Sequence, residues 1–397
     1  MNHSNKIWTK NFIVLFVINF ILALIFFLLV STIAVFSVEN FQTSTSIAGL
    51  LSGTFVIGSL FARLGAGRLI HKVGSQKVLL AGLIGFLLTT GLYIFISDIT
   101  LFFLNRLLHG CSFGIASTAT GTIIAQIIPP SRRGEGIGYY SLSTILSTAI
   151  GPFLGIFIVT QTANFSLIFL LNFIMAIIIL GLYFLVKVPT IETAPQEKKG
   201  FSISQFIEFR ALPIAIVAMV LGFVYSSIMA FISFYTEEIG LVKAGSFFFL
   251  IYACVVLVFR PITGRLMDQR GANLVIYPCL ALFASGMLIY SQAHHGYMII
   301  LAAILIGFGY GSFNSIAQAI AIKVTPKQRL GLATSTYFML FDLGLGLGPF
   351  TYGLLIPHIG FRGIYLVAFI MILISIVLYF LLHGKRDRQL IPLPTNN

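Results

Sequence analysis

Charged residues are scarce in this chain. Only 9% of its 397 residues are Asp, Glu, Lys or Arg, and 11 are acidic, whereas a soluble domain carries about a quarter charged residues. An integral-membrane enzyme would need a group of carboxylates or histidines at one membrane face, and the sequence contains no DDxxD or HExxH group. It also lacks the GxxxxGK[ST] loop of an ATP-driven pump. We therefore expect neither an enzyme nor an ATPase, and no cofactor.

Cysteine is equally rare. Cys111, Cys254 and Cys279 fall inside apolar blocks without CxxC spacing, which favours small buried hydrophobic residues over metal or redox roles. The adjacent pair His294 and His295 could bind a metal, but neighbouring histidines rarely chelate well alone. The sequence therefore predicts no metal site.

Apolar residues, by contrast, make up 58% of the chain. They occur in blocks of about 20, each long enough to cross a hydrocarbon core of about 30 Å as a helix. The blocks lack the alternation of a membrane β-barrel, and the first, at 11–38, is too long for a signal peptide. We predict an all-α polytopic membrane protein with 12 transmembrane helices. Their predicted ranges are 11–38, 45–64, 77–97, 99–121, 135–160, 165–187, 211–236, 245–262, 273–292, 296–322, 331–356 and 361–383.

The basic residues lie mostly on one set of alternating loops. A net charge of +13 could indicate a nucleic-acid partner, but only Lys243 and Arg362 fall in the opposite set of loops. Such a bias orients a membrane protein with its basic loops in the cytoplasm. We therefore expect a multi-pass protein of the cell (plasma) membrane, with cytoplasmic N- and C-termini, lipid as its surroundings and no nucleic acid.

Two stretches of the sequence match at a constant shift of 197 residues (260 − 63). Leu60–Gly74, LFARLGAGRLIHKVG, aligns with Leu257–Gly271, LVFRPITGRLMDQRG. The shift holds without a gap over about 90 residues and includes glycines, prolines and arginines. This pattern indicates a parallel repeat of six helices. We predict an N-terminal bundle at 1–187, a cytoplasmic linker at 188–210, and a C-terminal bundle with a short cytoplasmic tail at 211–397.

These repeated segments resemble a signature of the major facilitator superfamily (MFS), G-x-L-x-D-R-x-G-R-K, which follows the second helix. In that family the segment is a charge-paired latch on the cytoplasmic side. His71 stands where the family has Asp, which would weaken this latch or make it sensitive to pH, whereas Asp268 keeps the acid. The resemblance implies cytoplasmic gate loops that contain Gly67, Arg68, His71, Lys72, Gly74, Gly264, Arg265, Asp268, Arg270 and Gly271.

Two further motifs resemble the drug:proton antiporter branch of this superfamily. Arg106 and Gly110 match an R-x-x-x-G element in the predicted fourth helix. The segment 147–155 partly matches the G-x-x-x-G-P-x-x-G-G element of the fifth helix, and 344–353 repeats it. The resemblance implies two pseudo-symmetric six-helix bundles (the MFS fold) and a protein that works as a monomer.

The stretch DLGLGLGPF, at 342–350, combines an acid, three glycines and a proline within one apolar block. Glycines four residues apart let two helices approach closely, and a proline bends a helix. We therefore predict a close, hinged seam between the two bundles, with packing alone as the alternative. Its residues are Gly151, Pro152, Gly155, Gly344, Gly348 and Pro349.

Asp342 and Arg106 are the two candidates for proton coupling. Asp342 lies about ten residues into its predicted helix, ~15 Å deep, where an ionised acid costs about 2.5–3.5 kcal/mol. Shielding from water favours the protonated carboxyl, which is the property of a proton carrier. Arg106, ~10 Å deep, stays charged and would tune that site or bind an anionic group of the substrate. The alternatives are a structural partner for a buried polar group and a fixed internal strut.

The resemblance also implies a substrate cavity that is lined by the first and fourth helices of each half. A few polar side chains in an aromatic and aliphatic cleft would suit an amphiphilic organic molecule. The candidate lining residues are Asn19, Ser112, Thr118, Tyr225, Asn314 and Gln318.

Together these patterns predict a proton-coupled secondary active transporter, which exports small amphiphilic organic compounds by alternating access. Its partners would be protons and a small-molecule substrate. The alternatives are an exporter of a natural metabolite or metallophore and a proton-symport importer of a nutrient. A passive channel also remains open, and a demonstrated uphill flux would exclude it.

Overall fold

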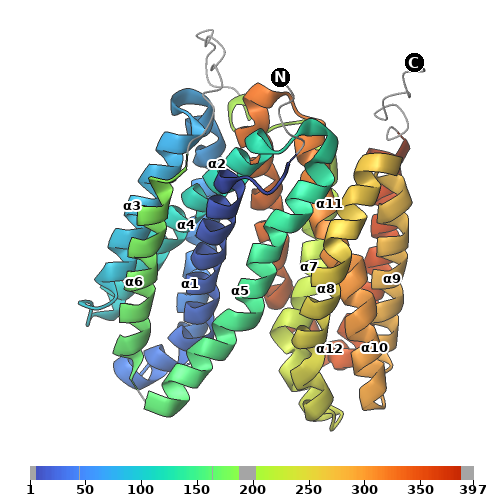
Figure 1. Cartoon of the computed structure of the whole chain (residues 1–397). Helices are drawn as coiled ribbons and strands as arrows, with labels where there is room; N and C mark the ends of the chain where they lie inside the picture. Colours follow the sequence, from blue (N-terminus) through green and yellow to red (C-terminus); the bar gives the residue numbers. More distant parts are fainter. Residues whose placement is uncertain (1–5, 44, 163, 187–202, 386–397) are drawn as a thin grey trace, which may run out of the picture. The chain divides into compact units, whose positions relative to one another are not determined.

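The computed structural model describes residues 6–43, 45–162, 164–186 and 203–385, and all regular elements in this part are helical (Figure 1). The long helices are α1 (Lys10–Phe41), α2 (Thr45–Val73), α3 (Ser75–Leu92), α4 (Ile99–Ile127), α5 (Arg133–Thr162), α6 (Phe165–Tyr183), α7 (Leu212–Glu238), α8 (Val242–Arg270), α9 (Asn273–Ser291), α10 (Gly296–Ile306), α11 (Ser312–Lys323) and α12 (Leu330–Leu382). Short helical turns are η1 (Pro130–Arg132), η2 (Ile203–Gln205), η3 (Gly307–Gly311) and η4 (Lys327–Arg329).

The predicted all-α polytopic architecture is confirmed. Within the described residues, 11 helical segments are long and apolar enough to cross a membrane. One of them contains α12, whose 53 residues would extend ~80 Å as a single helix, far beyond a hydrocarbon core of about 30 Å. Gly360 interrupts α12 with φ 67° and ψ 176°. The segment therefore consists of two consecutive helices, which correspond to the predicted 331–356 and 361–383.

The span predicted at 296–322 is also interrupted. Helices α10 and α11 are joined by η3, a π-helical turn formed by Gly307–Gly311. Such turns are frequent at functional sites in helices. The segment remains one candidate span, from Gly296 to Lys323.

The predicted ends of α2 and α8 differ most from the structure. Helices α2 and α8 continue to Val73 and Arg270, whereas the apolar blocks predicted ends at 64 and 262. Basic side chains near a helix C-terminus interact favourably with the helix dipole, so the helices extend past their apolar parts. They stop at Gly74 and Gly271, where φ is 91° and 90°, a conformation that glycine adopts readily.

Because α2 and α8 are longer than predicted, most residues of the predicted gate loops lie in helices. Gly67, Arg68, His71 and Lys72 lie in the last turns of α2, and Gly264, Arg265, Asp268 and Arg270 of the second copy lie in the last turns of α8. These side chains are therefore held by helices.

The chain divides into two compact units. The first comprises the described residues of Met1–Ile128, Ser143–Glu208 and Thr325–Met339. The second comprises those of Pro129–Leu142, Phe209–Val324 and Leu340–Asn397. Residues 129–142 and 325–339 are each grouped with the other half of the chain, so α5 and α12 each begin in one unit and continue in the other. The predicted bundle boundaries stay a prediction. Residues 188–202 of the predicted linker, and residue 187 before it, lie outside the described residues.

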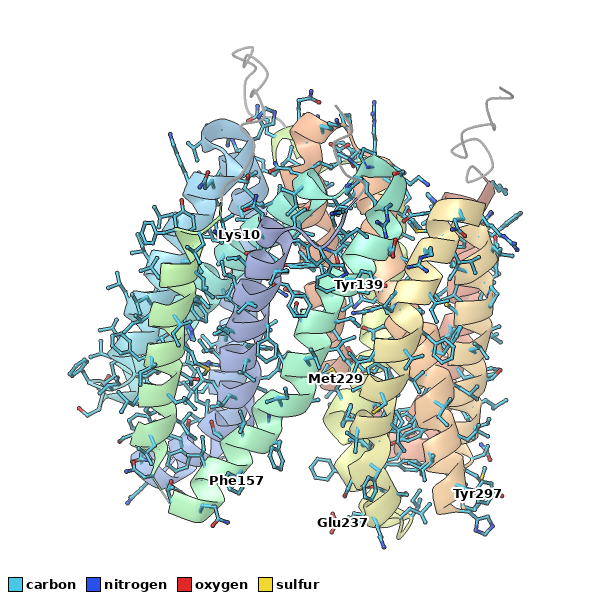
Figure 2. The ribbon with its side chains drawn as sticks, viewed as in Figure 1. Lys10, Tyr139, Phe157, Met229, Glu237 and Tyr297 are labelled. Atoms are coloured by element: carbon cyan, nitrogen blue, oxygen red, sulfur yellow. The ribbon has the colours of Figure 1, made fainter. Side chains whose placement is uncertain are left out.

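Each unit has its own helix packing. In the first unit α2 and α3 pack on α4, and α1 contacts α2, α4 and α6. In the second unit α8 and α9 pack on α10, and α7 contacts α8 and α11. Large apolar side chains such as Phe153 and Leu347 remain exposed on the helices, and so does Phe157 (Figure 2). An exposed apolar surface of this kind suits contact with lipid.

Candidate functional site

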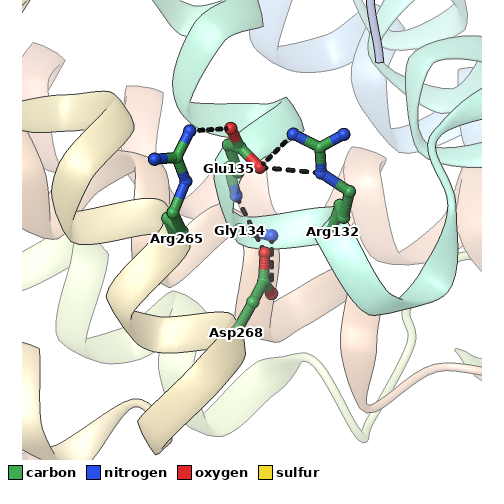
Figure 3. Close-up of polar contacts among 5 residues, drawn as sticks. All are labelled: Arg132, Gly134, Glu135, Arg265 and Asp268. Carbon is green, nitrogen blue, oxygen red and sulfur yellow. Dashed lines mark hydrogen bonds and ion pairs between the residues drawn. The ribbon is translucent and has the colours of Figure 1, made fainter. Parts of the chain in front are cut away.

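A cluster of charged side chains forms in the second unit, where the start of α5 meets the end of α8 (Figure 3). Glu135 is 3% exposed, and its carboxylate pairs with two arginines. Its Oε2 lies 2.7 Å from Nη2 of Arg132, and its Oε1 lies 2.7 Å from Nη2 of Arg265. Burying a carboxylate is costly unless it is paired and hydrogen-bonded, so the two guanidinium groups make this position tenable.

Asp268 joins the same cluster through the backbone of α5. Its two carboxylate oxygens accept hydrogen bonds from the backbone N–H groups of Gly134 and Glu135, at 2.9 and 3.0 Å. The first N–H groups of a helix have no partner within the helix, and a carboxylate there is favoured by the helix dipole. Asp268 thus ties the end of α8 to the first turn of α5. We call Arg132, Gly134, Glu135, Arg265 and Asp268 the α8 cluster.

The equivalent end of α2, in the first unit, packs against the start of α12. A Cβ atom added at Gly67 would lie 3.0 Å from the carbonyl oxygen of Gly331 and 2.9 Å from Cβ of Ser335. The Ser335 hydroxyl donates a hydrogen bond to the carbonyl of Arg63. Only glycine at position 67 allows so close an approach of the two helices.

Arg106 lies in α4 and is completely buried. Its Nε donates a hydrogen bond to the carbonyl oxygen of Leu51, at 3.3 Å. Its guanidinium carbon lies 4.9 Å from the centre of the Phe55 ring, a cation–π arrangement. Both contacts come from α2, so the charge is held by a neighbouring helix of the same unit.

His109 is a buried polar residue that we did not select from the sequence, although it lies one turn beyond Arg106. Its Nε2 lies 3.2 Å from Oγ1 of Thr90, and its Nδ1 lies 3.2 Å from the hydroxyl of Tyr93. The Phe86 ring packs on the imidazole, with 4.4 Å between the ring centres. The spacing Arg-x-x-His, which places two polar groups on one helix face, could have indicated this residue.

Asp342 lies in α12 and is neither fully buried nor fully exposed. It follows Phe341, whose carbonyl oxygen would lie 3.2 Å from a Cβ atom at Gly222 of α7. Asp342 belongs to the second unit and Arg106 to the first. Their roles in proton coupling remain predictions.

The predicted glycine seams are close helix contacts, but their location differs from the prediction. A Cβ atom at Gly151 would lie 2.7 Å from Cβ of Phe27 in α1, and one at Gly344 would lie 2.0 Å from the carbonyl oxygen of Met219 in α7. Each glycine and its neighbour lie in the same half of the sequence repeat, whereas we expected a seam between the two bundles. The reason is that the first and fifth helices of each half cross closely. Pro152 and Pro349 lie inside their helices, and the hinge role of these residues and of Gly155 and Gly348 remains a prediction.

Three of the predicted cavity residues have partners within the first unit. Nδ2 of Asn19 donates hydrogen bonds to the hydroxyls of Ser143, at 2.7 Å, and Thr144, at 3.1 Å. Oγ1 of Thr118 accepts a hydrogen bond from Nη1 of Arg63 at 3.2 Å, and Ser112 donates to the carbonyl of its own helix residue Leu108. Asn19 therefore connects α1 to α5, and Thr118 connects α4 to α2.

The other three predicted cavity residues lie in the second unit. Tyr225 stacks on Tyr310, with 4.1 Å between the ring centres, and on Tyr252, at 5.5 Å. Gln318 is 4% exposed, and no group among the described residues accepts a hydrogen bond from its Nε2. Asn314 is half-buried. An aromatic stack with a buried amide is compatible with the predicted lining, which remains a prediction.

Glu135 is the main site residue that the sequence interpretation missed. It is one of 11 acidic residues and lies three positions after Arg132 at the start of a predicted helix. Acids are favoured in a first helical turn, so this spacing was an available signal. Its pairing with Arg265, 130 positions along the chain, was not.

Comparison with known proteins identifies related transporters. The family model of the Major Facilitator Superfamily matches residues 15–296 and 245–395. The chain is 24% identical over 360 residues to the staphylopine export protein of Staphylococcus aureus, covering 86% of this chain and 89% of that protein. It is 23% identical over 371 residues to the multi-drug resistance efflux pump PmrA of Streptococcus pneumoniae, covering 90% of this chain and 92% of that protein.

The fold is also found among solved structures. The crystal structure of FucP, a Major Facilitator Superfamily transporter in the outward conformation, superposes with a TM-score of 0.78. It covers 98% of this chain and 100% of the FucP chain, at 15% sequence identity. At that identity the similarity shows the fold alone.

Proposed function

The chain belongs to the major facilitator superfamily, and from this premise we propose that it exports small amphiphilic organic compounds in exchange for protons. Members of this family are multi-pass membrane transporters of small molecules and not enzymes. The proposal concerns the direction of transport, its coupling and its substrate class.

Export is supported by the relatives. The two proteins described above are named as an export protein and an efflux pump, and each aligns with more than four fifths of this chain. This is the observation that carries the proposal. Export against a concentration gradient needs a source of free energy. Inward movement of a proton can supply it, because one positive charge moving inward gains ~2.3 kcal/mol per 100 mV of membrane potential.

Asp342 is proposed to carry the proton. It is an acid within an apolar helix, and such residues in membrane spans are expensive and usually functional. A carboxyl group that alternates between water on one side and water on the other can take up a proton in one state and release it in the other. Arg106 is proposed to assist as a fixed positive charge, because it is fully buried in α4 and cannot practically be deprotonated.

The α8 cluster and the α2–α12 contact are proposed to form the cytoplasmic gate. Both lie at helix ends that carry basic side chains, and the positive-inside rule places such ends in the cytoplasm. The proposal therefore includes cytoplasmic termini and a location in the cell membrane. In alternating access these contacts would break each time the substrate site opens to the cytoplasm.

A second candidate substrate class is a metal-chelating metabolite. The buried guanidinium of Arg106 is the kind of group that binds carboxylates through paired hydrogen bonds. A chelator with several carboxylates would use this charge more directly than a lipophilic drug.

Inside-out membrane vesicles that acidify their interior test the proposal. A pH-sensitive dye would follow the proton gradient while lipophilic cations, neutral drugs and polycarboxylate chelators are added one at a time. We expect at least one class to discharge the gradient in vesicles that contain the protein and not in matched empty vesicles. If no compound discharges it and right-side-out vesicles instead accumulate a compound with inward-moving protons, the protein is an importer and the proposal fails.

A further inference from the structure

The two copies of the gate segment differ in their acids. At the shift of 197 residues, Arg265 and Asp268 of the α8 cluster correspond to Arg68 and His71 at the end of α2. At the starts of α5 and α12, Glu135 corresponds to Leu332. The first unit therefore lacks, in its own repeat positions, both acids that hold the α8 cluster together.

Residues from the end of the linker occupy this place in the first unit. The carboxylate of Glu208 lies 2.5 Å from Nε of Arg329, and Arg329 is the repeat equivalent of Arg132. Nη2 of Arg329 donates a hydrogen bond to the carbonyl of Ser204 at 2.8 Å. The backbone N–H of Glu208 donates to Oγ1 of Thr336 at 2.9 Å. We call residues 204–208 the linker strap.

The strap also contacts α2. The guanidinium carbon of Arg68 lies 4.8 Å from the centre of the Phe206 ring. Arg68 is the repeat equivalent of Arg265, which pairs with Glu135 in the other unit. The strap thus provides a partner for each of the two arginines whose acid is missing from the repeat.

The burial of Glu208 distinguishes the linker strap from a segment that only connects two bundles. The side chain of Glu208 is only 5% exposed, and a buried carboxylate is costly without a paired cation. A segment that only connects two bundles has no reason to bury a charge. The start of α12, by contrast, gains a cross-link to α2 that passes through the strap.

We propose that Glu208 is a positioning residue of the gate, and that the linker strap holds the start of α12 against the end of α2 in the closed state. A gate has a role only in a transporter, so the inference rests on the proposed function. The contacts of the strap can nevertheless be tested without a transport assay. The strap would release when the gate opens, so the linker takes part in each transport cycle.

Thiol labelling tests the strap directly. In a variant with Cys111, Cys254 and Cys279 replaced, a Ser335→Cys substitution places a reporter at a position that is 1% exposed and contacts Arg63. A small neutral maleimide reaches it only when the gate opens. We expect Glu208→Gln to raise the labelling rate at least threefold, and Glu197→Gln, which removes the same charge elsewhere in the linker, to leave it unchanged.

Charge exchange separates positioning from a general loss of structure. Glu208→Arg is expected to speed labelling, and the double variant Glu208→Arg with Arg329→Glu to return it to within twofold of the parent. Only protein that elutes as a single species in detergent is counted. An unchanged rate in Glu208→Gln, or a double variant that labels as fast as the single reversal, would overturn the proposal. Because labelling needs no substrate, these outcomes remain readable even if proton-driven export is not found.

Discussion

The carboxylate of Glu135, at the start of α5, lies 2.7 Å from the guanidinium of Arg265, near the end of α8. The two residues come from different halves of the sequence repeat, and the pair is joined by Arg132 and by the contact of Asp268 with the first turn of α5. One acid is therefore buried beside two partly exposed arginines, an arrangement that suits the proposed gate.

The α8 cluster predicts non-additive effects of its arginines. Arg265→Gln leaves Glu135 paired with Arg132, and because Arg265 is 56% exposed the loss of stability should be small, as it is for exposed ion pairs in general. Replacing both Arg132 and Arg265 leaves a buried carboxylate unpaired, which costs about 3–5 kcal/mol. Thermal unfolding of the purified protein measures the difference.

A third substitution provides the control for this cycle. Adding Glu135→Gln to the double arginine variant removes the buried charge and should recover most of the lost melting temperature. If the melting temperature of the double variant falls only by the sum of the falls in the two single variants, the pairing of buried Glu135 is not what stabilises the cluster.

The glycine contacts predict a position-dependent effect of alanine. Gly344→Ala would place a Cβ atom 2.0 Å from the carbonyl oxygen of Met219, so the helices must shift at a cost of about 1–3 kcal/mol. Gly353→Ala in the same helix would meet only Phe231, at 3.9 Å. Alanine gains the same helix propensity at both positions, so the comparison isolates packing. The melting temperature should fall by several degrees for Gly344→Ala alone, and equal values would refute the close contact.

Arg106 is predicted to require its guanidinium and not only its charge. Arg106→Lys keeps the charge but loses the planar group that bonds to Leu51 and lies over Phe55. We expect export to slow about tenfold or more at unchanged protein level, which corresponds to about 1.4 kcal/mol. Phe55→Leu removes the cation–π contact together with the ring contacts of Phe55 to Phe26, Phe113 and His109, and it should slow export about two- to fivefold. If Arg106→Lys exports at the wild-type rate, a positive charge alone is sufficient at this position and the prediction is wrong.

Asp268 is predicted to act as a helix cap. Asp268→Asn keeps one acceptor for the N–H groups of Gly134 and Glu135 but loses the charge that complements the helix dipole, and Asp268→Ala loses both. The alanine variant should be less stable by about 0.5–2 kcal/mol, with the asparagine variant between it and the parent. The order of the three melting temperatures checks this, and alanine equal to the parent would contradict it.

The helices and the repeat could be predicted from sequence because membrane spans depend on local hydropathy. The helix ends could not, since the polar last turns of α2 and α8 carry no apolar signal, although Gly74 and Gly271 mark where they stop. The π-helical turn at Gly307–Gly311 likewise depends on packing between helices.

The charged contacts were only partly predictable. The signature residues Arg265 and Asp268 were recognisable from their local pattern, because motif positions are local in sequence. Glu208 was not, because its partner Arg329 follows far along the chain. The partners of Asn19 in α5 depend in the same way on how α1 and α5 pack.

The central claim is that Asp342 couples proton movement to export, and one measurement tests it most directly. Proteoliposomes would be assayed for two processes with the same substrate: uptake driven by a proton gradient, and exchange of labelled for unlabelled substrate with no gradient. We predict that Asp342→Asn abolishes gradient-driven uptake and retains exchange, because the substituted residue can no longer release a proton while the substrate site is intact. Gradient-driven uptake at the wild-type rate in Asp342→Asn would contradict the account.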